Sequence, residues 1–332
     1  MPRLMVVAEI REARPTRLTF ELLGMAQQLL GGGGQGLTAE TDSVAVVAFG
    51  PDVTGCIADL IACGADQVFT VDDPQLDDFD SDRWADALTG IASVNKPELI
   101  LLGHTSSGCD VAPRLAFRLG GAVVTGCSAI ALDAGTFLFT RACYGGNLLE
   151  TLYFEAGLTV ATQRSGSGPA PIRDASRRGC VIPWVPPAPG RTKVMARQRD
   201  AGETLRLEDA RVVIAGGRGI NGAQGFTELQ TLAAPLGAAV GASRVACDLD
   251  WCPKSWQIGL TGKSVSPELY IAIGISGASH HMAGCSRAKN IVAINQDPQA
   301  PIFRYARYGL VGDCAELVDA LSQALGVGGD AR

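Results

Sequence analysis

Short apolar runs alternate with amphipathic stretches along the first part of the chain. LMVVAEI (4–10), SVAVVAFG (43–50) and QVFTVDD (67–73) are typical of buried strands, and a fourth run lies in PELILLGHTSSG (97–108). The stretches between them, such as FELLGMAQQLL (20–30), repeat apolar residues at helical spacing. This alternation predicts an N-terminal α/β domain, with a Rossmann-like parallel sheet covered by helices on both faces.

Three further runs of this first domain look different. GAVVTGCSAIAL, TFLFTRACYGGN and LTVATQRSGSG occupy 121–132, 136–147 and 158–168 and follow one another without a helical pattern between them. We expect hairpin-like strands added at one side of the parallel sheet.

Proline and charge then replace the periodic pattern. Residues 183, 186, 187 and 189 are prolines, and a polar run extends to about residue 210. Such a composition suits a linker better than a core. The expected division is an N-terminal domain at 1–190, a linker at 191–207 and a second domain at 208–327.

The second half returns to α/β alternation. Its expected strands are 211–216, 238–243, 268–276, 290–297 and 308–313. Helices are expected at 224–236, from about 279, and at 315–325. This order predicts a smaller, doubly wound parallel sheet.

Composition narrows the class of protein. The chain has 332 residues, which is enough for about two domains. Of these residues 47% are hydrophobic and 19% are charged. A net charge of -6 argues against a surface that neutralises nucleic-acid phosphates. No apolar run reaches the roughly 18 residues of a membrane span, and the N-terminus has no targeting pattern, so we expect no membrane insertion and a cytoplasmic location. The ten cysteines lack metal-site spacing and are expected to be reduced thiols.

The segment after the first strand of the second domain matches a nucleotide-binding fingerprint. Residues 217–222 read Gly-Arg-Gly-Ile-Asn-Gly, which is G-x-G-x-x-G between a strand and a helix. Where an acid would bind a ribose hydroxyl stands Ser243-Arg244, and an arginine there favours a 2′-phosphate. Taken alone, this motif predicts an NADP-dependent oxidoreductase. No Tyr/Lys or His/Asp pair suited to hydride chemistry accompanies it.

Glycine-rich strand ends are gathered in this second domain. They are GGRG (216–219), GASR (241–244), QIGLTGK (257–263), GISGASHH (274–281), AIN (293–295) and GD (312–313). Strands of a parallel sheet end at one edge, where ligands bind. Small residues expose backbone N–H groups there, while Arg218, Arg244 and His281 are candidates for positive charge. We therefore expect one long anionic ligand, such as a dinucleotide.

Longer motifs in the same order point to a known family. VGASRVACD, QIGLTGKSVSPELYIAIGISGASHHMAG and KNIVAINQDPQAPIFRYARYGLVGD resemble the electron transfer flavoprotein alpha subunit, as do GHTSSGCDVAPRLAFRLGGAVVTG (103–126) and RACYGGN (141–147) of the first domain. The resemblance implies an FAD held mainly by the second domain. It also implies a separate beta subunit, contacted through the first domain.

The FAD contacts of the family fall on residues that lie mostly at the glycine-rich strand ends. They are Arg218, Ser243, Arg244, Ile258, Gly259, Leu260, Thr261, Ser276, Gly277, Ala278, Ser279, His280, His281, Asn295, Asp313 and Cys314.

The resemblance also implies their roles. Arg218 and Asn295 would lie along the diphosphate and adenosine half, and Ser276 on the phosphates. Thr261 would bond near flavin N5, Arg244 would lie against the isoalloxazine ring, and His281 near its O2 edge. Two cationic groups there would stabilise the negative charge of a reduced flavin.

Two positions of the implied FAD site depart from the family pattern. His280 stands where the family has glutamine, and Leu260 replaces the glutamine of QTG. His280 either faces the ring, which would make the flavin potential depend on pH, or points to solvent or the partner. The sequence leaves both possibilities open.

The implied function is that of an electron carrier with no substrate of its own. Electrons would come from flavin dehydrogenases, such as the acyl-CoA dehydrogenases of fatty acid beta-oxidation, and pass to a quinone oxidoreductase or another acceptor. Whether the beta subunit carries AMP or a second FAD is not encoded in this chain. A non-redox nucleotide-binding module is the third alternative.

Overall fold

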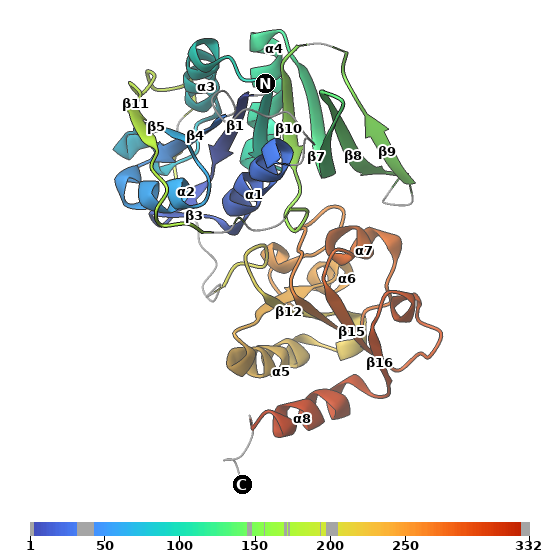
Figure 1. The fold of residues 1–332 in the computed structure, drawn as a ribbon. Helices are drawn as coiled ribbons and strands as arrows, with labels where there is room; N and C mark the ends of the chain where they lie inside the picture. The colour runs from blue at the N-terminus through green and yellow to red at the C-terminus, as the bar shows by residue number, and fades with distance from the viewer. Residues whose placement is uncertain are drawn as a thin grey trace. The chain divides into compact units, whose positions relative to one another are not determined.

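The computed structural model describes residues 3–31, 43–144, 148–155, 157–168, 171, 173–192, 194–196 and 205–326. It divides the chain into two compact units, Met1–Arg197 and Gln198–Arg332 (Figure 1).

A sheet of nine strands forms the centre of the N-terminal unit, within the described residues. Its order is β11-β5-β4-β1-β6-β10-β7-β8-β9. The first strands along the chain are β1 (Arg3–Ala8), β4 (Ser43–Gly50), β5 (Gln67–Asp72) and β6 (Leu99–Gly103). They pair in parallel, as their continuous apolar runs predict.

Helices cover both faces of this sheet. They are α1 (Arg17–Gly31), α2 (Ile57–Ala62), α3 (Ser81–Asn95) and α4 (Ser106–Leu119). Alternate residues of β1 enter two different cores: Leu4 and Val6 pack with α1 and α2, whereas Met5 and Val7 pack with α3 and α4. Shorter elements are β2 (Ile10–Arg11), β3 (Arg14–Pro15), η1 (Val53–Cys56) and η2 (Pro74–Asp77).

The added strands are only partly a hairpin. β7 (Ala122–Asp133) and β8 (Thr136–Cys143) are antiparallel, and β9 (Leu148–Leu152) continues that ribbon. The expectation for 158–168 is wrong, because β10 (Thr159–Gln163) inserts between β6 and β7 and is parallel to both. Every residue of β10 is buried, and a fully buried strand needs neighbours on both sides.

The proline-rich segment belongs in part to the first sheet. β11 (Cys180–Pro183) pairs in parallel with β5 at the sheet edge, where a proline costs no ladder bond. Beyond it, the Gly190 amide donates to Asp80 at 3.0 Å, and Arg191 pairs with Asp82 at 3.1 Å. The segment before residue 192 is therefore docked strand and loop. Residues 193 and 197–204 of the expected 191–207 linker lie outside the described residues.

The C-terminal unit contains a parallel sheet of five described strands in the order β13-β12-β14-β15-β16. They are β12 (Val212–Gly216), β13 (Ala239–Ala242), β14 (Leu269–Ile273), β15 (Asn290–Asn295) and β16 (Tyr308–Val311). The helices are α5 (Ala223–Ala233), α6 (Arg244–Asp248), α7 (Ser279–Cys285) and α8 (Cys314–Ala324), with single turns η4 (Arg218–Ile220), η5 (Ala234–Leu236), η6 (Lys254–Trp256) and η7 (Pro301–Arg304).

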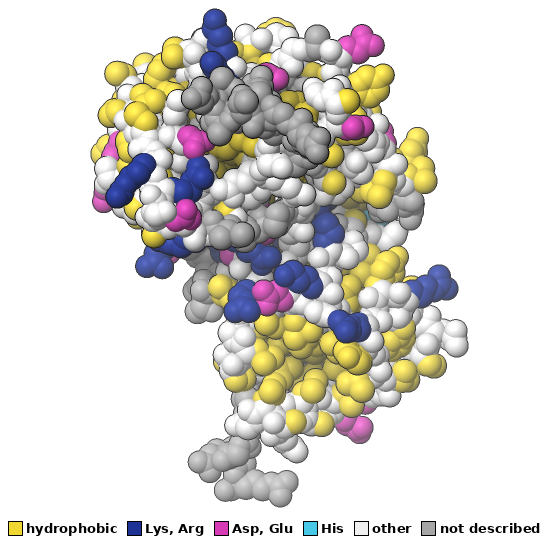
Figure 2. Space-filling view, in the orientation of Figure 1, with side chains coloured by type: hydrophobic (Ala, Val, Ile, Leu, Met, Phe, Trp, Pro, Cys, Tyr) yellow, Lys and Arg dark blue, Asp and Glu magenta, His cyan; other side chains and the backbone are white. Residues whose placement is uncertain are grey.

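Both faces of this second sheet are covered. Phe226 of α5 and Val318 of α8 pack on one face, and Met282 of α7 and Ile302 of η7 pack on the other. The expected doubly wound α/β class is therefore confirmed. Figure 2 shows a broad hydrophobic area on the visible face of this unit. In the part of the chain that the structure describes, no helix combines the length and the apolar character needed to span a membrane.

Candidate functional site

The carboxyl edge of the C-terminal sheet collects the loops that the sequence singled out. β12 and β14 are neighbours in the sheet, but the connection from β12 runs to β13 on one side and that from β14 runs to β15 on the other. Such a reversal separates the two connections and opens a crevice outside the carboxyl ends of the strands. The loops after these two strands form the centre of the candidate site.

These two central loops are in direct backbone contact. The Gly217 amide donates to Ile273 O at 2.8 Å, and the Gly219 amide donates to Gly274 O at 3.0 Å. A Cβ at Gly217 would lie 2.3 Å from Gly274 O. Gly274 has a φ of +64° and equally little room, because its Cβ would meet the Gly219 backbone at 2.7 Å. Only glycines permit this approach.

That contact explains the G-x-G-x-x-G pattern differently from a dinucleotide fingerprint. Arg218–Ile220 forms a single 3₁₀ turn, and α5 begins only at Ala223. The first two glycines of the motif face the neighbouring loop, whereas in the fingerprint one makes the tight turn and the other lets backbone approach the pyrophosphate. The NADP interpretation therefore loses its main structural argument.

A second pair of segments meets beside this centre. The Ile258 amide donates to Ala242 O at 2.9 Å, which attaches the loop 257–263 to the end of β13. The Leu260 amide donates to His280 O at 2.7 Å. A Cβ at Gly284 of α7 would lie 2.5 Å from the Gly259 amide nitrogen. The fold thus brings the predicted segments 258–261 and 276–281 together, although they are distant in sequence.

Exposed polar side chains surround these loops. Arg218, Arg244, Thr261 and Ser276 are exposed, and Ser243 is half-buried at the start of α6. The Arg244 Nε lies 3.2 Å from Asp248 Oδ2, while Arg218 makes no ion pair with a described residue. Two guanidinium groups and several hydroxyls are a donor set suited to phosphates and to an electron-rich ring.

Asn295, Asp313 and Cys314 serve the protein's own structure. The Asn295 side chain donates to Ile275 O at 3.0 Å and accepts from the Asp297 amide at 3.0 Å. Asp313 caps α8 by accepting from the Ala315 amide at 2.9 Å. The Cys314 side chain is buried in the core. These residues shape the edge, and the Cys314 thiol does not face a surface ligand.

The adjacent histidines have opposite environments. His280 is exposed, whereas His281 is 8% exposed, with its Nε2 at 2.8 Å from the Tyr270 hydroxyl. Burial lowers the pKa of His281 to about 4, although the Ile258 backbone opposes this shift. At neutral pH the His281 imidazole is therefore uncharged, and the expected second fixed cation is corrected to a neutral group.

Tyr270 was not among the predicted site residues. It is fully buried and occupies the middle of an apolar run, so its sequence context is that of a core residue. The only available signal was a hydroxyl within that run, which needs a partner when buried. The partner it finds is His281.

The neutral state of His281 predicts a pH-dependent stability. In the unfolded chain this imidazole titrates near 6.5, and in the fold its pKa is about 4, so below pH 6.5 the unfolded state binds the additional proton. Stability should therefore fall as pH decreases through this window, by about 2 kcal/mol between pH 7.5 and 5. Urea unfolding at each pH, monitored by hydrogen exchange of peptides from β14, would measure this change in the free energy of unfolding.

Two substitutions isolate this effect. His281→Gln is expected to remove most of the pH-dependent loss, whatever its own cost at pH 7.5. His280→Gln changes an exposed neighbour and should leave the loss as it is. An equal pH-dependent loss in the wild type and in His281→Gln would contradict the assignment.

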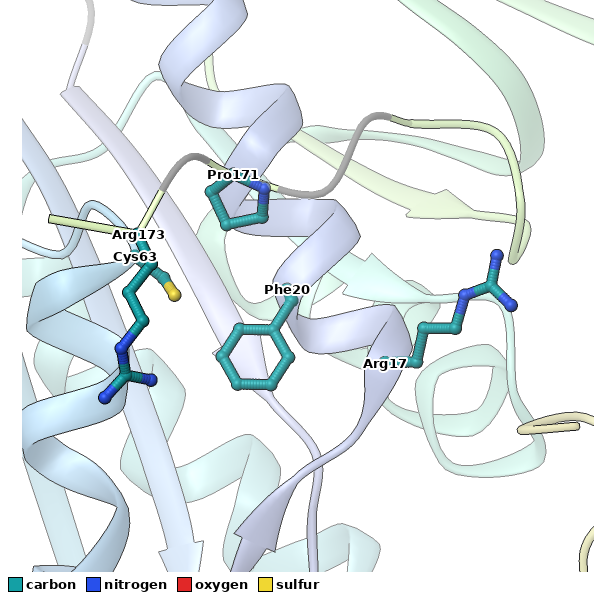
Figure 3. Close-up of a pocket in the computed structure, with 5 residues that line it drawn as sticks. All are labelled: Arg17, Phe20, Cys63, Pro171 and Arg173. Atoms are coloured by element: carbon teal, nitrogen blue, oxygen red, sulfur yellow. The ribbon is translucent and has the colours of Figure 1, made fainter. Parts of the chain in front are cut away.

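A separate pocket lies in the N-terminal unit. It has a volume of about 430 Å³ and is lined by Arg17, Phe20, Cys63, Pro171 and Arg173 (Figure 3). Its cations are engaged, because Arg17 pairs with Glu21 at 3.0 Å and Arg173 with Asp59 at 2.6 Å. In Figure 3 the Arg17 guanidinium points away from Phe20. The pocket lacks the convergent donors found at the carboxyl edge of the C-terminal sheet.

The residues at that edge fit a flavin dinucleotide. The loops approach one another through backbone that no side chain obstructs, and exposed hydroxyls and guanidinium groups surround them. This set of hydroxyls and guanidinium groups matches a ligand with phosphates and a heteroaromatic ring.

Comparison with known families agrees with this fit. Residues 4–189 match the electron transfer flavoprotein domain, and residues 206–286 match the electron transfer flavoprotein FAD-binding domain. The second match includes every predicted contact up to His281. It confirms FAD as the cofactor class of the C-terminal unit.

Similar proteins align along almost the whole chain. The electron transfer flavoprotein subunit alpha of Bacillus subtilis (strain 168) is 38% identical over 322 residues, which are 97% of this chain and 96% of the relative. That of Thermoanaerobacterium thermosaccharolyticum is 39% identical over 325 residues, or 96% of each chain. The protein FixB of Bradyrhizobium diazoefficiens is 36% identical over 335 residues, or 96% of this chain and 87% of the relative. With two family matches and these relatives, the chain belongs to the electron transfer flavoprotein alpha-subunit family.

Proposed function

We propose that this chain holds one FAD at the carboxyl edge of its C-terminal sheet and acts as an electron carrier in a heterodimer with a beta subunit. It takes electrons from flavin dehydrogenases and passes them to a quinone oxidoreductase or another acceptor. It converts no substrate of its own. Its family membership supports the role of carrier, and the partners follow from the same family.

One observation carries the placement of the cofactor. The carboxyl ends of all five strands lie at one edge, and the proposed contacts lie at these strand ends, in the segments that directly follow them, or in the loop 257–263. The tight glycine contacts hold these loops together, because the amides of Gly217, Gly219 and Gly259 donate to neighbouring backbone carbonyls. The exposed guanidinium and hydroxyl groups around the loops are then the donors that would recognise phosphates.

The side chains then have distinct tasks. Arg218 and Ser276 hold the phosphates, and Thr261 fixes the ring by a hydrogen bond. The Thr261 hydroxyl is already oriented, because it accepts from Gln257 Nε2 at 2.9 Å. FAD supplies the redox chemistry when bound, since its ring exchanges electrons singly or in pairs. The residues of this chain bind it, orient it and set the charge around it.

Arg244 supplies the fixed positive charge beside the ring. The guanidinium keeps its charge at any physiological pH, and its plane stacks on aromatic systems. Because His281 is neutral, Arg244 bears most of the electrostatic stabilisation of a reduced ring. His281 contributes a hydrogen-bonding group whose orientation Tyr270 fixes.

The proposed cellular setting is the cytoplasm. Fatty acid beta-oxidation is one process that uses such carriers. One similar protein carries the different name FixB, so the similar proteins do not single out beta-oxidation as the process. The donor and the acceptor therefore remain defined by class, a flavin dehydrogenase and a quinone oxidoreductase.

Co-expression with a beta subunit tests this function. We expect a yellow heterodimer whose extracted cofactor is FAD. Counting the flavins per heterodimer should give one FAD if the beta subunit carries AMP and two if it carries a second FAD. Colourless protein that binds NADPH would support the oxidoreductase alternative. Colourless protein that binds a nucleotide without flavin would support the non-redox module.

A further inference from the structure

Two cysteine side chains are in contact at the margin of a core cluster of the C-terminal unit. Cys247 lies in α6 and Cys252 in the turn before η6, and their Sγ atoms are 3.5 Å apart. All ten cysteines of the chain are free thiols. The sulfurs of a disulfide are about 2.05 Å apart, so the pair has to close by only about 1.5 Å.

The backbone holds the two sulfurs in register. The Asp250 amide donates to Cys247 O at 3.1 Å, and the Trp251 amide donates to Ala246 O at 3.1 Å. Asp250 has a φ of +56°, which folds the chain back onto α6. A non-glycine residue in this conformation marks a tightly specified turn. The contact between the sulfurs is therefore a property of the turn.

The electrostatics of the pair suit thiol exchange. A hydrogen bond from Cys252 lowers the pKa of Cys247, an effect that burial and Asp248 oppose and Lys254 assists. The same hydrogen bond raises the pKa of Cys252. Two sulfurs that share one proton provide a thiolate together with a thiol. Cys247 is buried and Cys252 is half-buried, so Cys252 is the sulfur that a small reagent reaches.

We propose that Cys247 and Cys252 form a reversible thiol–disulfide site whose oxidant is a small-molecule disulfide. The Cys252 thiol passes its proton along the hydrogen bond to the Cys247 sulfur and attacks one sulfur of the oxidant, whose S–S bond breaks, and the first thiol leaves with a proton. Cys247 then attacks the Cys252 sulfur, the new protein disulfide forms, and the second thiol is released. The protein loses two protons and two electrons, and the oxidant gains both as two thiols.

The site lies between two segments of the proposed flavin site. Ser243 and Arg244 precede Cys247, and the loop 257–263 follows Cys252. A disulfide would close the turn that connects them. Its formation does not require FAD, so its test and the test of the proposed function can fail separately.

Peptide mapping of the full chain provides the experiment. Trypsin cleaves after Arg244 and Lys254, so residues 245–254 form one peptide with both cysteines. After treatment with oxidised glutathione, denaturation and alkylation, we expect most of this peptide to be unalkylated and lighter by two hydrogen atoms. Dithiothreitol should restore two alkylated cysteines.

The peptide 179–191 is the internal control, because it holds only Cys180, which is exposed. It should acquire glutathione and never become lighter. Cys247→Ser should trap glutathione on Cys252, whereas Cys252→Ser should leave the buried Cys247 largely unmodified. The proposal is overturned if both cysteines of 245–254 stay alkylated while Cys180 carries glutathione.

Discussion

Gly274→Ala is expected to weaken FAD binding at least tenfold and to destabilise the C-terminal unit by about 2 to 5 kcal/mol. Two effects add at this position. The residue has a φ of +64°, a conformation that costs an L-residue energy, and its new Cβ would meet the Gly219 backbone at 2.7 Å. The neighbours are backbone atoms, which cannot rotate away as a side chain can. The loops after β12 and β14 must therefore separate.

Gly237→Ala is the matched control. Gly237 has a φ of +55°, but a Cβ there meets nothing within 4 Å. This variant carries the backbone strain alone, of about 1 to 2 kcal/mol, and should bind FAD as the wild type does. Titration of flavin-depleted heterodimer with FAD measures affinity, and urea unfolding measures stability. Equal FAD affinity in the two variants would show that the contact between the loops does not shape the cofactor site.

Arg244→Ala is expected to lower the two-electron reduction potential of the bound flavin by about 20 to 60 mV. A reduced flavin ring is more negative than an oxidised one, so removing a nearby cation destabilises the reduced form. The shift corresponds to about 1 to 3 kcal/mol, the range of one charge interaction near a protein surface. Because His281 is neutral, this loss is not compensated by the second expected cation. Redox titration with dyes of known potential gives the value.

Arg211→Ala controls for the change in net charge. Arg211 precedes the amino end of β12 and pairs with Glu268 at 2.8 Å, at the opposite edge of the sheet from the proposed cofactor. We expect the flavin potential of this variant to stay within about 5 mV of the wild-type value, since exposed charges beyond a Debye length of about 8 Å are screened. Arg244→Lys should shift the flavin potential less than Arg244→Ala does, because lysine keeps the positive charge but loses the planar stacking. Similar shifts in Arg244→Ala and Arg211→Ala would refute the local role.

Much of this protein is readable from local sequence. Apolar runs predicted most strands, and the order of runs and helical patterns predicted two parallel α/β sheets. Strand-end glycines located the candidate edge, because a parallel sheet places all its strand ends together. The motifs from VGASRVACD to YGLVGD identified the family, and the family model confirmed FAD.

Other features depended on contacts between distant residues. The insertion of β10 between β6 and β7 and the docking of β11 on β5 are choices among possible strand neighbours, which periodicity does not encode. The glycines at 217 and 219 have the same local pattern whether they face a phosphate or Gly274. His281 loses its charge because Tyr270 and the core surround it, and Cys247 meets Cys252 because the turn folds back. Sequence patterns thus determined the helices and strands and the sheet edge at which the cofactor is proposed to bind. Burial and packing depend on contacts from the whole fold, so only the tertiary structure decided the strand neighbours and the charge of His281.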